Sequence, residues 1–426
     1  MTGASDNSPG AGANASGRRE DLGPRDTSGY PGKWTLLAVA AAITTCGVLP
    51  VFLLTAQAVL ITRDLELSDI ELGWLVTVFF SAAALWSVPG GRLAHRIGPR
   101  TSAMSATLIA ATASVGMALA TRSYPLLLSL MVLGGAANAT TQIAANALLA
   151  ENIRSDRQGL AFGIKQSAVP VSTMVGGLAV PVLALTAGWR WSYGAAAAVA
   201  ILLTFVTKRV VQRGETSPAW LSARVEPPSV PPRPLVTIAV ATGLAAAATN
   251  ALAAFLVVWA VRVGLDEGNA GLLLAAASAV GITARVGAGI LADRHPRGSL
   301  VVVAAQMALG ASGFLLLAAS SPTLLVLGAI VAFGIGWSWP GLLILAVVRI
   351  SPLVAAKSTS VVQLGAFLGG AVGPILFVAT AEAVSFEIAW AVAGLGLLLA
   401  SALVLIGRRQ LTRKLRDAER PHPGHA

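Results

Sequence analysis

Twelve long apolar runs constrain this chain more than any other feature of its sequence. A helix that crosses the hydrocarbon core of a bilayer needs about 20 apolar residues, and 55% of the 426 residues are hydrophobic while 12% are charged. The sequence therefore predicts an all-α integral membrane protein with twelve transmembrane helices. The runs cover approximately residues 34–60, 70–93, 101–120, 124–150, 159–186, 191–207, 235–261, 269–292, 299–319, 323–348, 357–380 and 386–407.

The basic residues are distributed unevenly between the loops that connect these runs. A formal net charge of +11 is compatible with nucleic-acid binding only if the cations share one soluble face, and here they lie in short loops. If both termini are cytoplasmic, 24 of the 30 Lys and Arg residues fall on that side, as the positive-inside rule requires. We expect a multi-pass protein of the bacterial cytoplasmic (inner) membrane, embedded in the lipid bilayer, with no nucleic-acid partner.

The sequence lacks the motifs of common enzymes. It contains no phosphate-binding loop, no His-Glu-x-x-His motif and no nucleophile elbow, which argues against an enzyme and against an ATP-driven pump. The single cysteine, Cys46, lies within the first apolar run, so neither a disulfide framework nor a cysteine metal site is expected. We expect no metal and no cofactor.

Short motifs recur at a nearly constant offset and indicate a duplicated half. Gly91-Arg-Leu-Ala-His-Arg96 nearly repeats as Gly289-Ile-Leu-Ala-Asp-Arg294, since 289 − 91 = 198 residues. Internal repeats in a hydropathic chain are typical of secondary transporters. The predicted organisation is a disordered tail (1–33), a six-helix half (34–207), a proline-rich linker (208–234), a second half (235–407) and a basic tail (408–426).

The two motifs resemble the cytoplasmic loop signature of the major facilitator superfamily, Gly-x-Leu-Ala-Asp-Arg-x-Gly-Arg-Arg or Lys. The Gly-Trp-Arg-Trp run that ends at Trp191 and the six-linker-six layout are also similar to that family. The resemblance implies twelve helices in two pseudo-symmetric halves, with helices 1, 4, 7 and 10 around a central cavity and helices 5 and 8 in contact across the halves.

The repeated motifs also predict a latch between the halves. A carboxylate there can cap a helix N-terminus or pair with a basic side chain, but the first copy has His95 where the second has Asp293, which indicates a weaker or pH-sensitive first latch. An ordinary basic turn is the alternative. The candidate gating residues are Gly91, His95, Arg96, Arg100, Arg285, Gly289, Asp293 and Arg294.

Polar side chains inside the predicted helices are candidates for a transport site, because each is costly in lipid. Asn138, Gln142 and Asn146 recur at i, i+4 and i+8 and are expected on one face of helix 4; amides that only join helices are the alternative. Asn250 lies near mid-depth in helix 7. Trp337 and Trp339 in helix 10 differ by two positions, so we expect them to face different ways, with at most one on the substrate.

Three further candidates lie in the cytoplasmic third of helices 5 and 11. Lys165 is too deep to reach the membrane surface easily, and Gln166 follows it. Gln363 occupies a similar place at an offset of 197. Lys165 together with Arg285 could attract an anion; a gate pairing is the alternative, and we favour it for Arg285.

The missing carboxylate is equally informative, because none of the 19 acidic residues is expected at mid-depth in a helix. Cation and drug antiporters usually need such a group. We expect alternating-access transport, secondary active or facilitative, of a small organic anion or neutral metabolite. A coupling proton or a counter-substrate stays open. The alternatives are efflux of apolar or cationic drug-like compounds and, from another class, a channel or membrane receptor.

Overall fold

The computed structural model of the protein describes residues 33–119, 123–152, 158–211, 233–294, 299–350 and 355–419. Residues 1–32 of the predicted tail, 212–232 of the predicted linker and the His95 side chain lie outside this description. Within the described residues, twelve helical spans are long and apolar enough to cross a membrane, and they correspond in order to the twelve predicted runs. The predicted all-α fold with twelve membrane helices is therefore confirmed.

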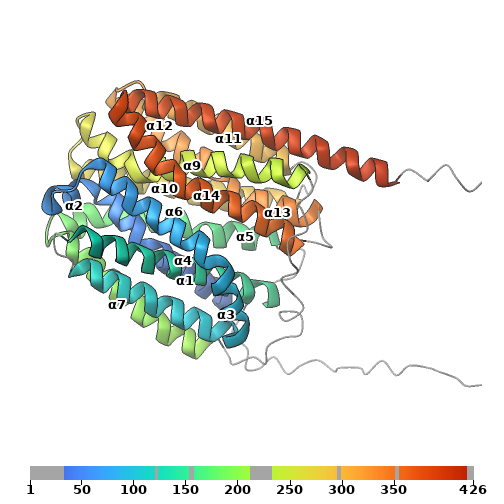
Figure 1. Ribbon diagram of the computed structural model, residues 1–426, viewed down its shortest axis with the longest axis horizontal. Coiled ribbons are helices and arrows are strands. Elements are labelled where there is room, and N and C mark those ends of the chain that lie inside the picture. The colour runs from blue at the N-terminus through green and yellow to red at the C-terminus, as the bar shows by residue number, and fades with distance from the viewer. Residues whose placement is uncertain are drawn as a thin grey trace, which may run out of the picture.

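The helices form two groups of six spans, the N-terminal half and the C-terminal half, which lie side by side (Figure 1). The N-terminal half contains α1 (Lys33–Ala56), α2 (Ala58–Leu65), α3 (Asp69–Ala118), α4 (Tyr124–Asn152), α5 (Gln158–Gln166), α6 (Ala168–Ala179), the π-helix η2 (Val180–Ala184) and α7 (Trp189–Val210). The C-terminal half contains α9 (Arg233–Arg262), α10 (Glu267–Arg294), α11 (Ser299–Leu317), α12 (Pro322–Ala329), the π-helix η3 (Ile330–Gly336), α13 (Trp339–Ile350), α14 (Ala355–Ala383) and α15 (Phe386–Glu419).

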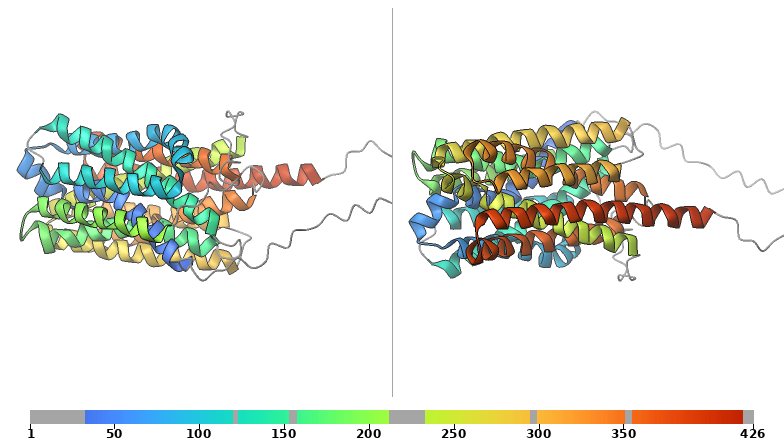
Figure 2. Two further views of the ribbon diagram at one scale, coloured as in Figure 1. Left: turned by 90° about the horizontal axis from the view of Figure 1, so that it is seen from below. Right: turned by 90° about the horizontal axis from the view of Figure 1, so that it is seen from above.

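The two ends of the bundle differ. We call the end where α15 terminates the basic end, because Lys208 and Arg294 also lie at helix ends there and Arg100 contacts Lys208. The opposite end, near α2, is the far end (Figure 1). The C-terminal part of α15 projects past the other helices at the basic end (Figure 2). This helix continues beyond residue 407, where the last apolar run ends, because the following residues are mainly good helix formers without Gly or Pro.

The first motif forms a tight turn and not an open loop. The chain stays helical through it, apart from Gly98 at φ 79° and ψ 164°. Glycine adopts a positive φ without steric cost, and Pro99 follows as a favourable first residue of the next helix.

At the far end, Ser68 and Glu71 form a capping box at the start of α3. Asp266 caps α10, and the Asn269 backbone N–H holds the pKa of its carboxyl below the usual value.

Glycines set the spacing of helices that pack across the two halves. α3 packs against α14, and α10 packs against α5 and α6. A Cβ on Gly73 would lie 2.9 Å from a Val378 methyl group of α14, and one on Gly271 would lie 2.7 Å from the Gly177 carbonyl oxygen of α6. Gly73 and Gly271 are equivalent positions at an offset of 198. The repeat found in the sequence is therefore built into the interface between the halves.

The repeated glycine pairs lie where helices approach each other closely. The first members, Gly176 and Gly369, face the first helix of their own half, since a Cβ on each would meet Phe52 O of α1 or Gly243 O of α9. Of the second members, Gly177 faces the opposite half at Gly271 O, whereas Gly370 lies between the Phe80 ring of the opposite half and Asn250 of its own half. One Gly-Gly step thus holds a helix against both of its neighbours.

Adding one methyl group at Gly177 tests this packing. The Cβ of Gly177→Ala would lie 2.5 Å from Gly271 O and 2.9 Å from Ala275 N, so the backbones must separate. We expect a loss of about 1–3 kcal/mol in the free energy of unfolding, read as a lower apparent Tm in detergent. Gly194→Ala in α7, which meets nothing within 4 Å, is the matched control and should be neutral or stabilising. Equal Tm values for both variants would contradict the packing.

Candidate functional site

A cavity of about 110 Å³ lies between the two halves. Both halves contribute to its wall, which includes Arg285. Seven of the nine substrate-site candidates line it: Asn138, Gln142, Gln166, Asn250, Trp337, Trp339 and Gln363. Sequence positions spread over more than 200 residues are therefore brought together at one place.

Lys165 lies directly behind this wall. Its side chain is 4% exposed, and its ammonium group donates to Oε1 of Gln142 and, at 3.3 Å, to Oε1 of Gln166. Both amides line the cavity. The bonds to described residues use two of the three ammonium hydrogens, so one donor stays available beside the cavity.

Arg285 joins the halves through carbonyl groups at two helix breaks. Its Nε and Nη2 donate to Trp337 O at 3.0 and 2.5 Å, where η3 has ended and α13 has not begun. Its Nη1 donates to Gln166 O, the last residue of α5 in the opposite half. Helix C-termini expose carbonyls and a partial negative charge that a cation stabilises. The guanidinium therefore holds the two breaks together, and two of its five N–H groups have no bond to a described residue.

The two buried cations have no acidic partner in the part of the chain that the structure describes. Every described ion pair involves other residues, and Lys165 and Arg285 bond only to neutral oxygens. Burying an ion costs several kcal/mol unless an opposite charge and hydrogen bonds compensate it. Among the described residues, only neutral oxygen atoms therefore compensate these two charges.

The amides of α4 do not act as one face. Asn138 is buried and Gln142 half-buried at the cavity, whereas Asn146 is exposed and outside the cavity wall. At 100° per residue, a position eight residues along is turned by about 80°, so the i, i+8 pattern places Asn146 away from Asn138. On α9, Asn250 also lines the cavity and donates from Nδ2 to Ala246 O at 2.8 Å.

Trp337 and Trp339 both line the same cavity, unlike the expectation that they face different ways. That expectation assumed a continuous helix, and the chain is not helical between η3 and α13. Phe52, Phe80 and Phe367 add apolar surface to the wall. No pattern in the sequence distinguishes these three residues, because they resemble any other aromatic residue in an apolar run.

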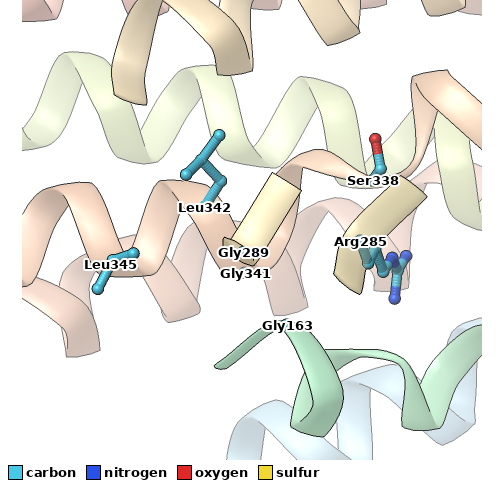
Figure 3. A pocket seen from close by; sticks show the side chains of 7 residues that line it. All are labelled: Gly163, Arg285, Gly289, Ser338, Gly341, Leu342 and Leu345. Carbon is cyan, nitrogen blue, oxygen red and sulfur yellow. The ribbon is translucent and has the colours of Figure 1, made fainter. Parts of the chain in front are cut away.

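Three helices pack closely between the cavity and the basic end: α5, α10 and α13. Gly163 faces α10, where a Cβ would lie 3.0 Å from Arg285 O and 3.6 Å from the Gly289 Cα. Figure 3 shows these residues together with Gly341 of α13 and with Ser338, which immediately precedes α13. Gly289, a predicted motif residue, therefore serves the close contact between the halves.

The second motif copy binds across the halves. Asp293 accepts from the Leu160 backbone N–H, in the first turn of α5, at 3.0 Å, and it pairs with Arg349 of α13 at 3.1 Å. Arg349 also donates to Ala292 O at 2.8 Å. Asp293 thus caps a helix of the opposite half, as the motif predicted; its partners, Leu160 and Arg349, carry no motif that could have identified them.

The first motif copy makes no comparable contact among the described side chains. Arg100 donates to Lys208 O of α7, within its own half, at 2.5 Å. Gly91 has open space around it, and Arg96 is exposed, as is Arg294 of the second copy. Apart from His95, whose side chain is not described, the side chains of the two copies therefore differ in their contacts.

At the far end two ion pairs connect the halves, and the sequence analysis missed both. Arg63 pairs with Glu267 at 2.9 Å, and Arg262 pairs with Asp69 at 2.5 Å. Each pair is the repeat counterpart of the other, since 262 − 63 = 199 and 267 − 69 = 198. A search for opposite charges at equivalent positions of the repeat could have found them.

Charge exchange tests the far-end pairs. Arg262→Asp places two carboxylates together and should lower the apparent Tm and widen the far end, measured as the distance between spin labels on α2 and α10. The double variant Asp69→Arg, Arg262→Asp restores opposite charges and should recover most of the effect, about 0.2–1 kcal/mol for an exposed pair. An Arg190–Asp64 exchange within one half is the control and should not change that distance. No recovery in the double variant would contradict the pairing.

The sequence model of the Major Facilitator Superfamily matches residues 35–304 and 238–424 of the chain. The chain is also similar to the putative metabolite transport protein YwtG of Bacillus subtilis (strain 168), with 26% identity over 159 residues. That stretch covers 37% of this chain and 34% of the relative, so the match spans about a third of the relative's length.

Proposed function

The chain belongs to the Major Facilitator Superfamily, and we propose that it transports a small organic anion by alternating access, through secondary active or facilitated movement. The main support for this proposal is the pair of buried cations, Lys165 and Arg285, beside a cavity with no described carboxylate. An anionic solute supplies the charge that the site lacks, and a cavity between the halves can open to either side in turn.

Each wall of the cavity has a part in this function. Lys165 and Arg285, with Gln142 and Gln166, attract and orient the anionic group. The indole and phenyl rings cover the carbon skeleton and exclude water, which strengthens the electrostatic attraction. The buried cations disfavour a cationic drug. The apolar wall favours an apolar molecule, so efflux of an uncharged apolar compound is the alternative function. Resistance of the host to such compounds when the protein is overexpressed tests that alternative.

The contacts at the two ends serve as alternating gates. Asp293 and its partners close the basic end, and the two ion pairs close the far end. Opening either end breaks only the contacts at that end, so a small free-energy change selects the open side. A channel or receptor needs no such reciprocal closure. Counterflow distinguishes them, because a carrier preloaded with unlabelled solute accelerates uptake of label.

The orientation follows from the charges. We place the basic end in the cytoplasm, since it carries most of the Lys and Arg residues, and the positive-inside rule then sets the far end outside. The protein is assigned to a bacterial cytoplasmic membrane, and it acts as a carrier and not as an enzyme.

Replacing Lys165 tests the anion site. In proteoliposomes, Lys165→Ala should lower kcat/KM for small carboxylates about tenfold or more, because a charge-assisted hydrogen bond is worth about 1.5–3 kcal/mol. Lys165→Arg should keep part of the activity, since it retains the charge. Lys208→Ala, an exposed lysine of α7, is the control. Unchanged transport in Lys165→Ala would reject the proposed site.

Replacing Asp293 tests the gate at the basic end. A single cysteine at Gly341 of α13, where this helix packs near Gly163 of α5, reports access from that end in a Cys46→Ala background. Asp293→Ala should raise its labelling by a membrane-impermeant thiol reagent several-fold, because both the Leu160 and Arg349 contacts are lost. The exposed neighbour variant Arg294→Ala should leave labelling unchanged. Identical labelling in the two variants would remove the gate.

A further inference from the structure

Two residues of the cavity wall each have a buried polar side-chain atom with no hydrogen-bond partner among the described residues. These atoms are Oδ1 of Asn138 and Nε1 of Trp339, and both residues line the cavity. Asn138 is 2% exposed and Trp339 is 3% exposed. An unpaired buried donor or acceptor is costly, so such atoms beside a binding cavity indicate what the bound group supplies.

The two atoms need complementary partners. The amide oxygen of Asn138 needs a donor, and the indole N–H of Trp339 needs an acceptor. A carboxylate cannot donate to Asn138, and an ammonium group cannot accept from Trp339. A hydroxyl group does both.

Each unpaired atom lies close in the chain to one of the buried cations. Asn138 is one helical turn from Gln142, the partner of Lys165, which places their Cβ atoms about 5–6 Å apart. Trp339 is two residues from Trp337, whose carbonyl oxygen binds Arg285. A hydroxyl on the second or third carbon of an acid can therefore lie near these atoms while the carboxylate faces the cations.

We propose that the transported solute is a small hydroxy acid, whose carboxylate binds at Lys165 and Arg285 and whose hydroxyl binds at Asn138 and Trp339. This proposal rests on the anion transport proposed above and names its substrate class. Asn138 and Trp339 become the residues that distinguish hydroxy acids from plain acids.

Two pairs of labelled acids test this specificity in proteoliposomes: 2-hydroxypropanoate against propanoate, and 3-hydroxybutanoate against butanoate. The full-length protein should prefer the hydroxy acid of at least one pair by about tenfold or more in kcat/KM, because polar groups that stay unpaired reject the analogue that lacks the hydroxyl. Asn138→Leu and Trp339→Phe should each reduce that preference towards one and keep transport of the plain acid, which also shows that both variants fold.

The chain offers a matched control for each variant. Asn146→Leu removes an exposed amide eight residues further along α4, outside the cavity wall. Trp390→Phe removes another buried and unpaired indole N–H, which lies against Phe314 and Phe377 and not at the cavity. Both controls should keep the preference for the hydroxy acid.

Three outcomes would overturn the proposal. Equal kcat/KM for both acids of each pair would mean that the protein does not read the hydroxyl. A preference that survives in Asn138→Leu and Trp339→Phe, or an equal loss for both acids, would leave water as the partner of the two atoms. If none of the four acids is transported, the proposal of anion transport itself is rejected. This result differs from equal transport of the two acids in a pair, which rejects only the recognition of the hydroxyl.

Discussion

The contact between the Arg285 guanidinium and the carbonyl oxygens of Gln166 and Trp337 is the interaction on which the site depends. Two membrane helices are interrupted next to the cavity, and each interruption frees carbonyls that lipid cannot satisfy. One buried cation satisfies a carbonyl at each break and connects the two halves. The same arrangement leaves a positive charge beside the cavity without a described acidic partner. The guanidinium that binds the free carbonyl oxygens therefore also favours the binding of an anion.

The repeat explains the interface, and its imperfections explain the site. Gly73 and Gly271, the two glycine pairs and the two far-end ion pairs all follow the repeat, so the halves meet through nearly symmetric contacts. At the cavity the symmetry is broken: Gln166 has its counterpart in Gln363, but the residue before Gln363 is Val362 where the first half has Lys165. A symmetric frame can rock about its centre, while an asymmetric lining can hold a polar solute in one orientation.

Much of the fold could be predicted, because a span in lipid is fixed by length and apolarity alone, and the charges of the loops and the repeated glycines added the layout. Polar residues within apolar helices were good predictors of the cavity wall, as Gln142 and Asn250 illustrate. Helical periodicity gave wrong predictions at two places. It placed Asn146 on the same face as Asn138 although eight residues rotate the helix by about 80°. It placed Trp337 and Trp339 on different faces although the helix is broken between them. The aromatic wall and the partners of Asp293 were beyond prediction, since apolar residues and backbone N–H groups carry no mark of their role in the sequence.

The proposed transport requires that Lys165 and Arg285 bind the negative charge of a solute. Ligand-induced thermal stabilisation of the purified carrier tests it directly, because a ligand that prefers the folded state must raise the apparent Tm. The measurement compares small carboxylic acids with their primary amides and with amines of equal carbon skeleton, at matched ionic strength. Carboxylates should raise the Tm in a saturable manner, whereas amides and amines should not. Equal stabilisation by the amides, or stabilisation by the amines alone, would contradict it.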